Sequence, residues 1–389
     1  MIETSGLSLG VESVFPQAEY ERRVDAAREA MAARGVDALV VTGPENLFYL
    51  SGQQTPGYYT FQCMIVTLEG KPVFLLRQLE LHNFRRNTFV TNVELYPDNA
   101  QPAEALVDQL TKLRLAGKRV AIEKRGWFLP IGFYERLADR LGSVADGSGI
   151  VEGLRRVKSP LELSMIEEAA KLTDLGVKAG LAAIRPGASE NAVVAAMLSA
   201  SISGGSEYLG MEPLVSSGPR SGIPHATWRR RTIEQDDPVF LEMASSYNRY
   251  HAALMRAAWV GTAPHDVREM MKVCREALEA ALAAMRPGVT FEAVHDAAQA
   301  VIDRNGMTER YKKRTGYSLG ISFAPDWGEW QVASLYTGER DVLAPGMVFH
   351  LPTALREYGV YTVGVSETAI VTETGCRTLS TVPRELIQV

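Results

Sequence analysis

Apolar positions in the first part of the chain alternate between helical spacing and short unbroken runs. Helical spacing is typical of residues 20–34, 103–115 and 133–141. Short runs rich in Val, Ile and Leu, which are typical of buried strands, occupy residues 37–42, 64–68, 72–76 and 119–123. Gly43-Pro44-Glu45-Asn46 is typical of a turn. Alternating helices and strands favour an α/β fold, so we expect one α/β domain over residues 1–155.

A polar hinge, Arg155-Arg156-Val157-Lys158, precedes a strong helix start at Ser159-Pro160-Leu161-Glu162. The serine can cap free backbone amides, proline fits the first helical position, and the glutamate completes a capping box. We therefore place a domain boundary near residue 155 and expect a second domain over residues 156–389.

The second domain contains an internal repeat. Residues 181–193 and 282–294 are identical at eight of thirteen positions, and both contain Arg-Pro-Gly between two helical patterns. Chance similarity of two Ala-rich helices is the alternative, but the shared Arg-Pro-Gly favours a duplicated half-domain. We expect two helix pairs packed against strands at 238–244, 249–260, 348–351 and 365–371, with a turn at 245–248. Along the first of these strands Phe240, Glu242 and Ala244 share one face, since alternate residues of a strand do.

Composition excludes several classes of partner. The 389 residues carry 41 Lys and Arg against 46 Asp and Glu, so no nucleic acid is expected. No apolar run approaches the roughly 20 residues that cross a bilayer, and no signal peptide is visible. The three cysteines, Cys63, Cys274 and Cys376, form no paired motif. We expect a cytoplasmic protein with no membrane partner, no disulfide and no thiolate zinc site.

Several segments, in order along the whole chain, resemble the creatinase/aminopeptidase P family. They are residues 37–46, the hinge 157–162, the duplicated C-domain, Gly346-Met-Val-Phe349 and Val371-Thr-Glu-Thr-Gly375. The resemblance implies a creatinase-like α/β N-terminal domain and an α+β "pita-bread" catalytic domain with an internal pseudo-twofold repeat. It also suggests a homodimer, in which the loop at residues 53–62 can reach the partner subunit.

Peptidases of this family use two metal ions held by five side chains. Carried over position by position, the five ligands fall on Glu242, Ala253, Tyr317, Pro352 and Ser366. Ala and Pro have no donor, Ser and neutral Tyr are poor donors, and one Glu does not hold a two-metal centre. We therefore expect no metal, no other cofactor and no ordinary aminopeptidase activity.

Within the family, two metal-independent branches act on small C–N compounds. Ala253-Leu-Met-Arg256 approaches the creatinase pattern, but the acidic residues of creatinase fall here on Met255 and Pro352. The ectoine hydrolase branch is matched by more segments: Pro224-His225-Ala-Thr-Trp228, Arg249-Tyr-His251, Thr315-Gly-Tyr317, Pro325-Asp-Trp-Gly-Glu329 and Phe349-His350. The loop at residues 53–62 departs from that branch, which leaves the substrate open.

The resemblance, together with the chemistry of the side chains, suggests roles for ten residues. Glu242 is expected to act as general base or nucleophile, and His225 to transfer a proton to the leaving nitrogen. The expected substrate-binding residues are Tyr317, His350, Glu367, Trp327, Glu329, His251 and Arg256. Arg256 or Arg220 is expected to hold a substrate carboxylate.

Each assignment has a structural alternative. Glu242 can instead be a buried partner of Arg256, and His350 can be a core histidine with both nitrogens bonded. The leading hypothesis is a hydrolase that opens the cyclic amidine ectoine to N-acetyl-diaminobutyrate. The alternatives are a creatinase-like or other amide hydrolase of a different small zwitterion, an Xaa-Pro peptidase-like protein, and a protein that only binds its ligand.

Overall fold

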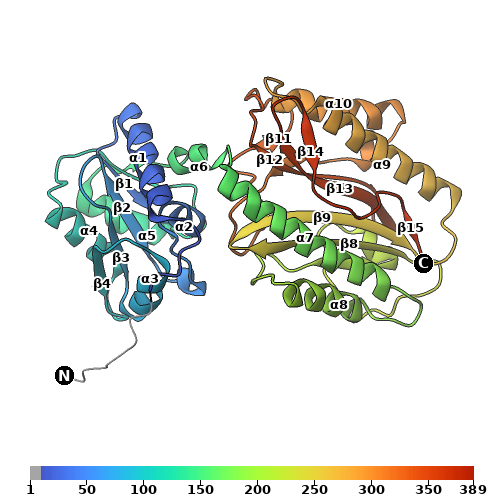
Figure 1. Cartoon of the computed structure of the whole chain (residues 1–389), viewed down its shortest axis with the longest axis horizontal. Coiled ribbons are helices and arrows are strands. Elements are labelled where there is room, and N and C mark those ends of the chain that lie inside the picture. The colour runs from blue at the N-terminus through green and yellow to red at the C-terminus, as the bar shows by residue number, and fades with distance from the viewer. Residues whose placement is uncertain (1–9) are drawn as a thin grey trace. The chain divides into compact units, whose positions relative to one another are not determined.

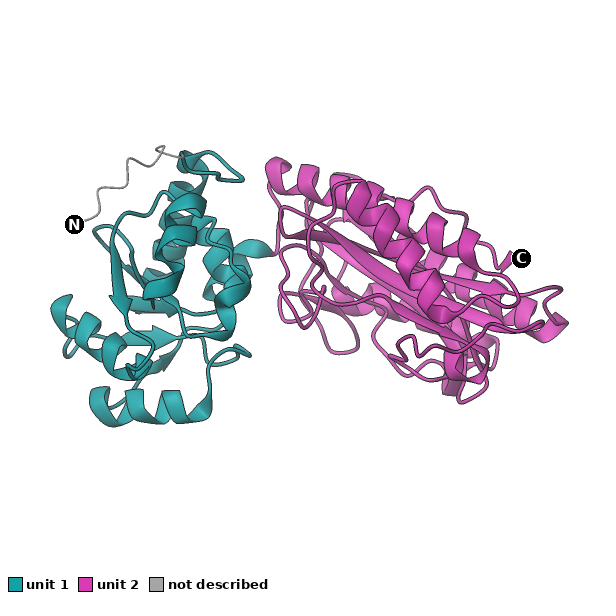
Figure 2. Cartoon of the chain, turned by 90° about the horizontal axis from the view of Figure 1, so that it is seen from below, with its two compact units in different colours: residues 1–155 teal, residues 156–389 magenta. Residues whose placement is uncertain are grey.

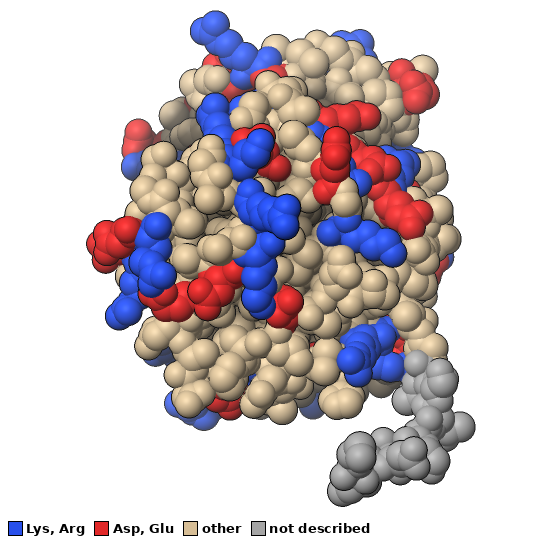
Figure 3. Space-filling view, turned by 90° about the vertical axis from the view of Figure 1, so that its left-hand side faces the viewer, with Lys and Arg blue, Asp and Glu red and all other residues tan. Residues whose placement is uncertain are grey.

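The computed structural model describes residues 10–389. The chain divides between Arg155 and Arg156 into two compact units, which Figure 2 shows in different colours. No helix among residues 10–389 is long and apolar enough to cross a membrane. On the face shown in Figure 3, Lys and Arg side chains lie interspersed with Asp and Glu side chains. This face therefore lacks the concentrated positive charge that phosphate binding needs.

The N-terminal unit is an α/β domain around one six-stranded sheet, in the order β4-β3-β2-β1-β5-β6 (Figure 1). Its strands are β1 (Ala38–Val41), β2 (Cys63–Thr67), β3 (Val73–Arg77), β4 (Val93–Tyr96), β5 (Val120–Ile122) and β6 (Ala145–Asp146). Its helices are α1 (Gln17–Ala33), α2 (Pro44–Ser51), α3 (Leu81–Asn87), α4 (Pro102–Lys112), α5 (Ile131–Leu141) and α6 (Ile150–Arg155). Strands β2 and β3 form the expected antiparallel hairpin.

One local prediction in this unit is wrong. The predicted turn at residues 43–46 is the start of α2. The buried carboxylate of Glu123 accepts hydrogen bonds from the amides of Thr42 (2.7 Å) and Gly43 (2.8 Å) and from the Asn46 side chain (2.7 Å). A carboxylate at this position satisfies amides that a helix start leaves free, so a residue distant in sequence supplies the cap.

The C-terminal unit consists of two sheets and four long helices. One sheet has the order β15-β9-β8-β7 and the other the order β11-β10-β12-β13-β14. The strands are β7 (Leu214–Ser217), β8 (Pro238–Tyr247), β9 (Tyr250–Trp259), β10 (Gly316–Ser318), β11 (Ser334–Leu335), β12 (Val348–Glu357), β13 (Tyr361–Val371), β14 (Cys376–Thr378) and β15 (Ile387–Gln388). The helices are α7 (Pro160–Ala183), α8 (Glu190–Ser203), α9 (His265–Ala284) and α10 (Phe291–Arg304).

The internal repeat has a structural counterpart in these helices. Gly187, between α7 and α8, and Gly288, between α9 and α10, adopt left-handed φ angles of 86° and 82°. Ser189 and Thr290 then cap α8 and α10 in the same way, each accepting a hydrogen bond from the amide three residues later. The predicted capping box of Ser159 and Glu162 at the start of α7 is also present. The fold expected from the family resemblance is therefore confirmed.

The strands of both sheets bury one face against the helices. Leu241 and Met243 of β8 lie in a core with residues of α7 and α8, and Leu351 and Val365 of β12 and β13 lie in a core with residues of α9 and α10. Because successive side chains point to opposite faces, the residues between them lie on the other face, which we call the site face.

Hydroxyl side chains join the two sheets where β9 and β13 run side by side. Thr368 accepts a hydrogen bond from the Ala253 amide (3.1 Å) and donates one to the Ala253 carbonyl (2.8 Å). The Ser366 hydroxyl accepts one from the Met255 amide (2.7 Å). The site face therefore continues across a boundary that has no β ladder between these two strands.

Candidate functional site

Glu242 lies on the site face at the middle of β8. It pairs with Met255 of β9, and only 8% of the residue is exposed. Burial raises the pKa of its carboxyl, while the charges of Lys313 and Arg356 lower it. The carboxyl forms no hydrogen bond with any described residue. The Nδ1 atom of His350 lies 4.0 Å from Glu242 Oε1. A buried carboxyl with a raised pKa and no fixed donor suits proton transfer.

A chain of hydrogen bonds runs beside Glu242. The Trp327 indole donates to the Tyr317 hydroxyl (2.8 Å), the Tyr317 hydroxyl lies 2.9 Å from His350 Nδ1, and His350 Nε2 lies 2.7 Å from the Ser366 hydroxyl. Tyr317 and His350 are directly opposite each other on β10 and β12. The structure therefore brings together three of the predicted substrate-binding residues, and it adds Ser366 to them.

Either neutral tautomer of His350 fits this chain of hydrogen bonds. Burial lowers the pKa of His350 well below its ordinary value, so the ring is neutral and has one N–H and one lone pair. The Tyr317 oxygen already accepts from Trp327, and the Ser366 oxygen accepts from the Met255 amide. When His350 donates from Nδ1, the Tyr317 proton is left for a group on the site face; the other tautomer leaves the Ser366 proton.

Three further charged residues act on Glu242, and none of them was selected from the sequence. Lys313, Arg356 and Asp326 all shift the pKa of its carboxyl by their charges. Burial, followed by the charge of Arg356, lowers the pKa of Lys313 to about 7. Burial raises the pKa of Asp326. Asp326 belongs to the Pro325–Glu329 motif, and Arg356 follows His350 at even spacing on β12, so both had a sequence signal.

His225 lies at an exposed position after a short 3-10 helix. Its φ of 56° is a left-handed value that few non-glycine residues adopt. Its charge acts on Asp326, which in turn acts on Glu242. The catalytic role expected for His225 stays a prediction.

Two predicted substrate-binding residues, Arg256 and Glu367, lie on the helix side of the sheets instead. Arg256 pairs with Leu241, so it points away from Glu242. Its guanidinium donates to the backbone carbonyls of Met255, Ser366, Val382 and Pro383 and to Glu367 at 3.1 Å. Glu367 also accepts from Arg384 at 3.0 Å. This buried ion pair fixes the C-terminal segment. The substrate-binding role expected for Arg256 and Glu367 is therefore corrected to a structural one.

His251 has a structural role as well. Its Nε2 accepts a hydrogen bond from the Gly210 amide (3.0 Å) and its Nδ1 donates to the Arg249 carbonyl (3.0 Å). The side chain is fully buried, and burial lowers its pKa to about 3. Both ring nitrogens are used by the backbone, so the expected substrate contact of His251 is wrong.

Glu329 is likewise engaged inside the protein. Its carboxylate accepts hydrogen bonds from Lys158 (2.9 Å), from the Ser318 hydroxyl (3.1 Å) and from the Ile321 amide (3.1 Å). Both partners of the Lys158–Glu329 ion pair are almost completely buried. This pair holds the loop that carries Asp326 and Trp327, so Glu329 supports the site rather than facing a substrate.

The five positions that carry metal ligands in peptidases of the creatinase/aminopeptidase P family all lie on the site face. They are occupied by Glu242, Ala253, Tyr317, Pro352 and Ser366, on β8, β9, β10, β12 and β13 respectively. Among residues 10–389 no group of three or more His, Cys, Asp and Glu side chains is placed to hold a metal ion. This donor set does not fit a two-metal centre, which needs several oxygen or imidazole ligands.

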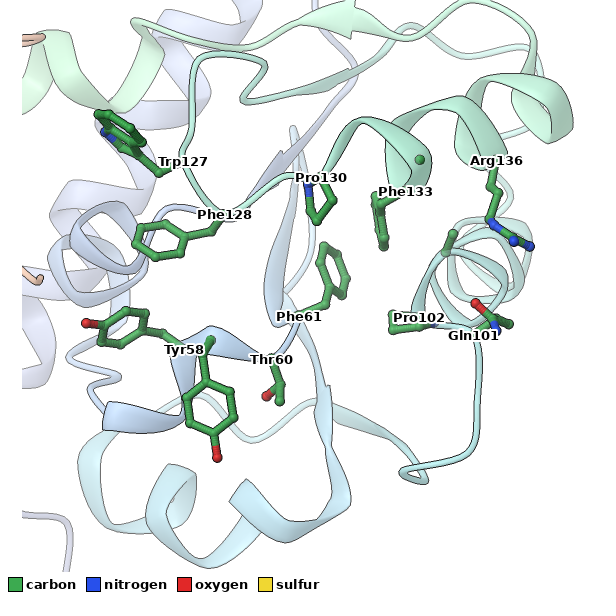
Figure 4. Close-up of a pocket in the computed structure, with 13 residues that line it drawn as sticks. Tyr58, Thr60, Phe61, Gln101, Pro102, Trp127, Phe128, Pro130, Phe133 and Arg136 are labelled. Atoms are coloured by element: carbon green, nitrogen blue, oxygen red, sulfur yellow. The ribbon is translucent and has the colours of Figure 1, made fainter. Parts of the chain in front are cut away.

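The N-terminal unit has a separate aromatic cavity of about 430 Å³ (Figure 4). In its lining, Tyr58 and Phe61, from the loop that departs from the ectoine hydrolase pattern, pack directly on Phe128 and Phe133; the ring centroids are 5.2 Å apart in the first pair and 4.2 Å in the second. Its rim carries Trp127, which is 69% exposed. The loop is therefore ordered by aromatic packing within its own unit.

Comparison with known proteins agrees with the fold and indicates a hydrolase. Residues 164–373 match the model of metallopeptidase family M24, and residues 23–157 match the creatinase/prolidase N-terminal domain. An ectoine hydrolase of Halomonas elongata is 29% identical over 96% of this chain and 98% of its own length. An uncharacterised hydrolase/peptidase of Sinorhizobium fredii is 32% identical over 96% of this chain and 97% of its own.

Several solved peptidase structures share this fold. A dipeptidase from Mycobacterium ulcerans superposes with a TM-score of 0.85 at 26% identity, covering 96% of this chain and 99% of that one. A prolidase from Thermococcus sibiricus superposes with a TM-score of 0.87 at 23% identity, covering 95% and 99%. With the M24 model covering more than half of its residues, the chain belongs to metallopeptidase family M24, a family of hydrolases.

Proposed function

We propose that this protein is a metal-independent hydrolase of a small cyclic amidine, with ectoine as the substrate. One feature supports this function most directly. Of the five ligand positions of the peptidases, only Glu242 keeps a carboxylate, and it stands beside the Tyr317–His350 pair. A lone carboxylate with nearby hydroxyl and imidazole groups suits attack on an amidinium carbon, where the substrate itself carries the positive charge. The ectoine hydrolase among the relatives of this chain supports the choice of substrate.

In the proposed reaction the Glu242 carboxylate lies against the amidinium and takes a proton from a water molecule. The water oxygen bonds to the carbon between the two ring nitrogens, and one C–N bond breaks as that nitrogen takes up a proton. The products are an amide and a free amine. A carboxylate attacking the carbon directly, with later hydrolysis of the adduct, uses the same residue and gives the same products.

Tyr317 and His225 have distinct roles in this scheme. With His350 donating from Nδ1, the Tyr317 proton is free to hydrogen bond a nitrogen or the developing tetrahedral centre. His225 lies at the exposed side and exchanges protons with solvent and the leaving nitrogen. Trp327 fixes Tyr317 through its indole N–H.

We also propose a homodimer. Tyr59 at the tip of the loop and Trp127 beside the aromatic cavity are 76% and 69% exposed. Exposed aromatic rings gathered at one place are typical of an interaction surface. In a dimer of the kind that the family resemblance suggests, this loop would contribute to substrate choice.

The function is tested with chelator-treated protein incubated with ectoine, hydroxyectoine, creatine and the dipeptide Gly-Pro, followed by proton NMR. We expect ectoine to be converted to N-acetyl-diaminobutyrate at a rate that chelation does not change. Cleavage of Gly-Pro only after addition of Mn²⁺ would instead show a metal-dependent peptidase. Turnover of creatine alone would point to the creatinase-like alternative.

A matched pair of variants tests the role of Glu242. Glu242→Gln removes the base but keeps the size of the side chain, so kcat is expected to fall by about 10²–10⁴-fold. The exposed Glu373→Gln is the control and should retain full activity. Circular dichroism spectra of both variants should match that of the unmodified protein. Full activity of Glu242→Gln would remove this residue from the mechanism.

A further inference from the structure

Two cations whose charges act on the Glu242 carboxyl, Lys313 just before β10 and Arg356 near the end of β12, have no partner among residues 10–389. Neither forms a hydrogen bond or an ion pair with these residues, and the Nε atom of Arg356 is buried without an acceptor. Both side chains are half-buried. A charge taken out of water without a partner is unfavourable, so such groups in native proteins usually await a ligand or another charge.

Neighbouring cations show that this is not a general feature of the segment. Lys312 pairs with Glu309 at 2.8 Å, and Arg310 pairs with Glu357 at 2.7 Å. Arg314 donates to the Ser334 hydroxyl at 2.9 Å and lies over the Trp330 ring. Among the cations of residues 310–314, Lys313 therefore differs from its neighbours in having no partner.

The position of Arg356 follows from the register of its strand. His350, Pro352, Ala354 and Arg356 alternate along β12 with side chains that pack against α9 and α10, so they share the site face. Small side chains separate Arg356 from His350, and the opposite residue of Ala354 on β13 is Gly364. The guanidinium thus lies on the same face as the His350 and Glu242 groups, with only small residues between.

The arginines expected from the sequence to bind a carboxylate are already engaged. Arg256 donates to four backbone carbonyls and to Glu367 on the helix side. Arg220 donates to Glu190 at 2.6 Å and to the Thr227 carbonyl. Neither has a free donor pair for a ligand on the site face.

We propose that Lys313 and Arg356 bind the carboxylate of a zwitterionic substrate whose cationic C–N centre lies against Glu242. This inference rests on the proposed function of the same site and specifies the class of substrate. The arginine offers a fork of N–H donors that matches a carboxylate, and the lysine adds a point charge. The ligand carboxylate then pairs with Lys313 and Arg356, and the cationic centre of the ligand pairs with Glu242. One ligand therefore neutralises all three charges.

The selectivity that follows is for ligands that carry both charges. A ligand with the same cationic centre but no carboxylate leaves Lys313 and Arg356 without a partner. Loss of the charge-assisted hydrogen bonds is expected to weaken binding on the order of 100-fold. Cyclic amidines, guanidines and dipeptides with a carboxylate would all satisfy this rule, so it is independent of which bond the enzyme cleaves.

The test uses three pairs of ligands that differ only in the carboxylate. They are ectoine and 2-methyl-1,4,5,6-tetrahydropyrimidine, creatine and N,N-dimethylguanidine, and Gly-Pro and glycyl-pyrrolidine. Binding to the full-length protein is measured by isothermal titration calorimetry. The Glu242→Gln variant is measured in parallel, so that turnover does not obscure binding.

We expect at least one carboxylate-bearing ligand to bind about 100-fold more tightly than its partner. Lys313→Met and Arg356→Met should each reduce this ratio at least 10-fold, while the neighbouring Lys312→Met should keep it. A pair other than ectoine showing the effect would refute ectoine as the substrate and support the carboxylate site. If no pair shows a preference in the unmodified protein, or if both variants keep the preference, the inference is overturned.

Discussion

The pH dependence of stability offers a sharp test of the role of His251. The Gly210 amide can only donate and the Arg249 carbonyl can only accept, so the neutral Nδ1–H tautomer fits both contacts. A second proton on Nε2 would face the Gly210 N–H. Burial of the ring, followed by the charge of Arg249, lowers the pKa of His251 in the folded protein to about 3, against an ordinary value of 6.5.

The sign and size of the effect follow from these two values. Above pH 6.5 both states have a neutral imidazole, so His251 gives no pH dependence there. Between 6.5 and about 3 the unfolded chain binds a proton that the folded chain does not, so stability falls as the pH falls. At about pH 5 this amounts to about 2 kcal/mol of unfolding free energy, at 1.36 kcal/mol per pH unit. The figure hardly changes as long as the folded pKa lies below 4.

The assay is urea unfolding followed by circular dichroism at about pH 8 and about pH 5. His251→Gln keeps an acceptor for the Gly210 amide but cannot titrate, so its loss of stability between the two pH values should be about 2 kcal/mol smaller than that of the unmodified protein. The exposed His82→Gln is the matched control and should behave like the unmodified protein. Equal losses in His251→Gln and the unmodified protein would refute the reasoning. A KM raised more than about 10-fold by His251→Gln would restore its expected substrate role.

Three further outcomes follow from the structure. Arg256→Met leaves the buried Glu367 with only Arg384 and should destabilise the protein by about 3–5 kcal/mol, seen as a lower melting temperature; an unchanged melting temperature would contradict the structural role. Tyr317→Phe removes the hydroxyl between Trp327 and His350, so kcat should fall by about 10–100-fold while the melting temperature changes little; an unchanged kcat would exclude the hydroxyl from catalysis. The acid limb of the kcat/KM profile should lie above the ordinary value of 4.5, because burial raises the pKa of Glu242, and a limb at or below that value would argue against this carboxyl as the base.

Much of the fold can be predicted from the sequence because local signals agree with the packing. The Arg-Pro-Gly repeats, the caps at Ser189 and Thr290 and the capping box at Ser159 all set helix ends through contacts within a few residues. The start of α2 was missed because its capping carboxylate, Glu123, lies about 80 residues away in the chain. A cap that comes from so distant a residue forms only when the sheet brings β1 and β5 together, so the local sequence does not reveal it.

Some site residues can be selected from residue type alone, whereas others can be placed only when the strand register is known. Glu242, Tyr317 and His350 were selected from residue type and motif, and the structure places them together on the site face. Glu367 was misassigned because the connection between β12 and β13 has three residues, 358–360. A connection of two residues would have exchanged the two faces of β13 relative to β12, and the sequence does not determine which length is used.

The placement of Arg256 depends on the turn between two strands, and that of Arg356 depends on the length of a strand. The two-residue turn between β8 and β9 places even-numbered residues of one strand opposite odd-numbered residues of the next, which turns Arg256 away from Glu242. Carrying the alternation through the turn would have shown this from the sequence. Arg356 was missed because the strand was expected to end at residue 351, whereas β12 continues to Glu357.

The hydroxyl contacts of Ser366 and Thr368 between β9 and β13 have a mechanical consequence. Glu242 belongs to the sheet on one side of the β9–β13 boundary, and His350 belongs to the sheet on the other side. These three hydrogen bonds and the two from Arg256 to the Ser366 carbonyl and to Glu367 are all made by side chains, and they resist sliding less firmly than a continuous backbone ladder does. Mild denaturant should therefore separate Glu242 from His350 before either half melts. Catalysis in this protein would then vanish at a lower urea concentration than its circular dichroism signal.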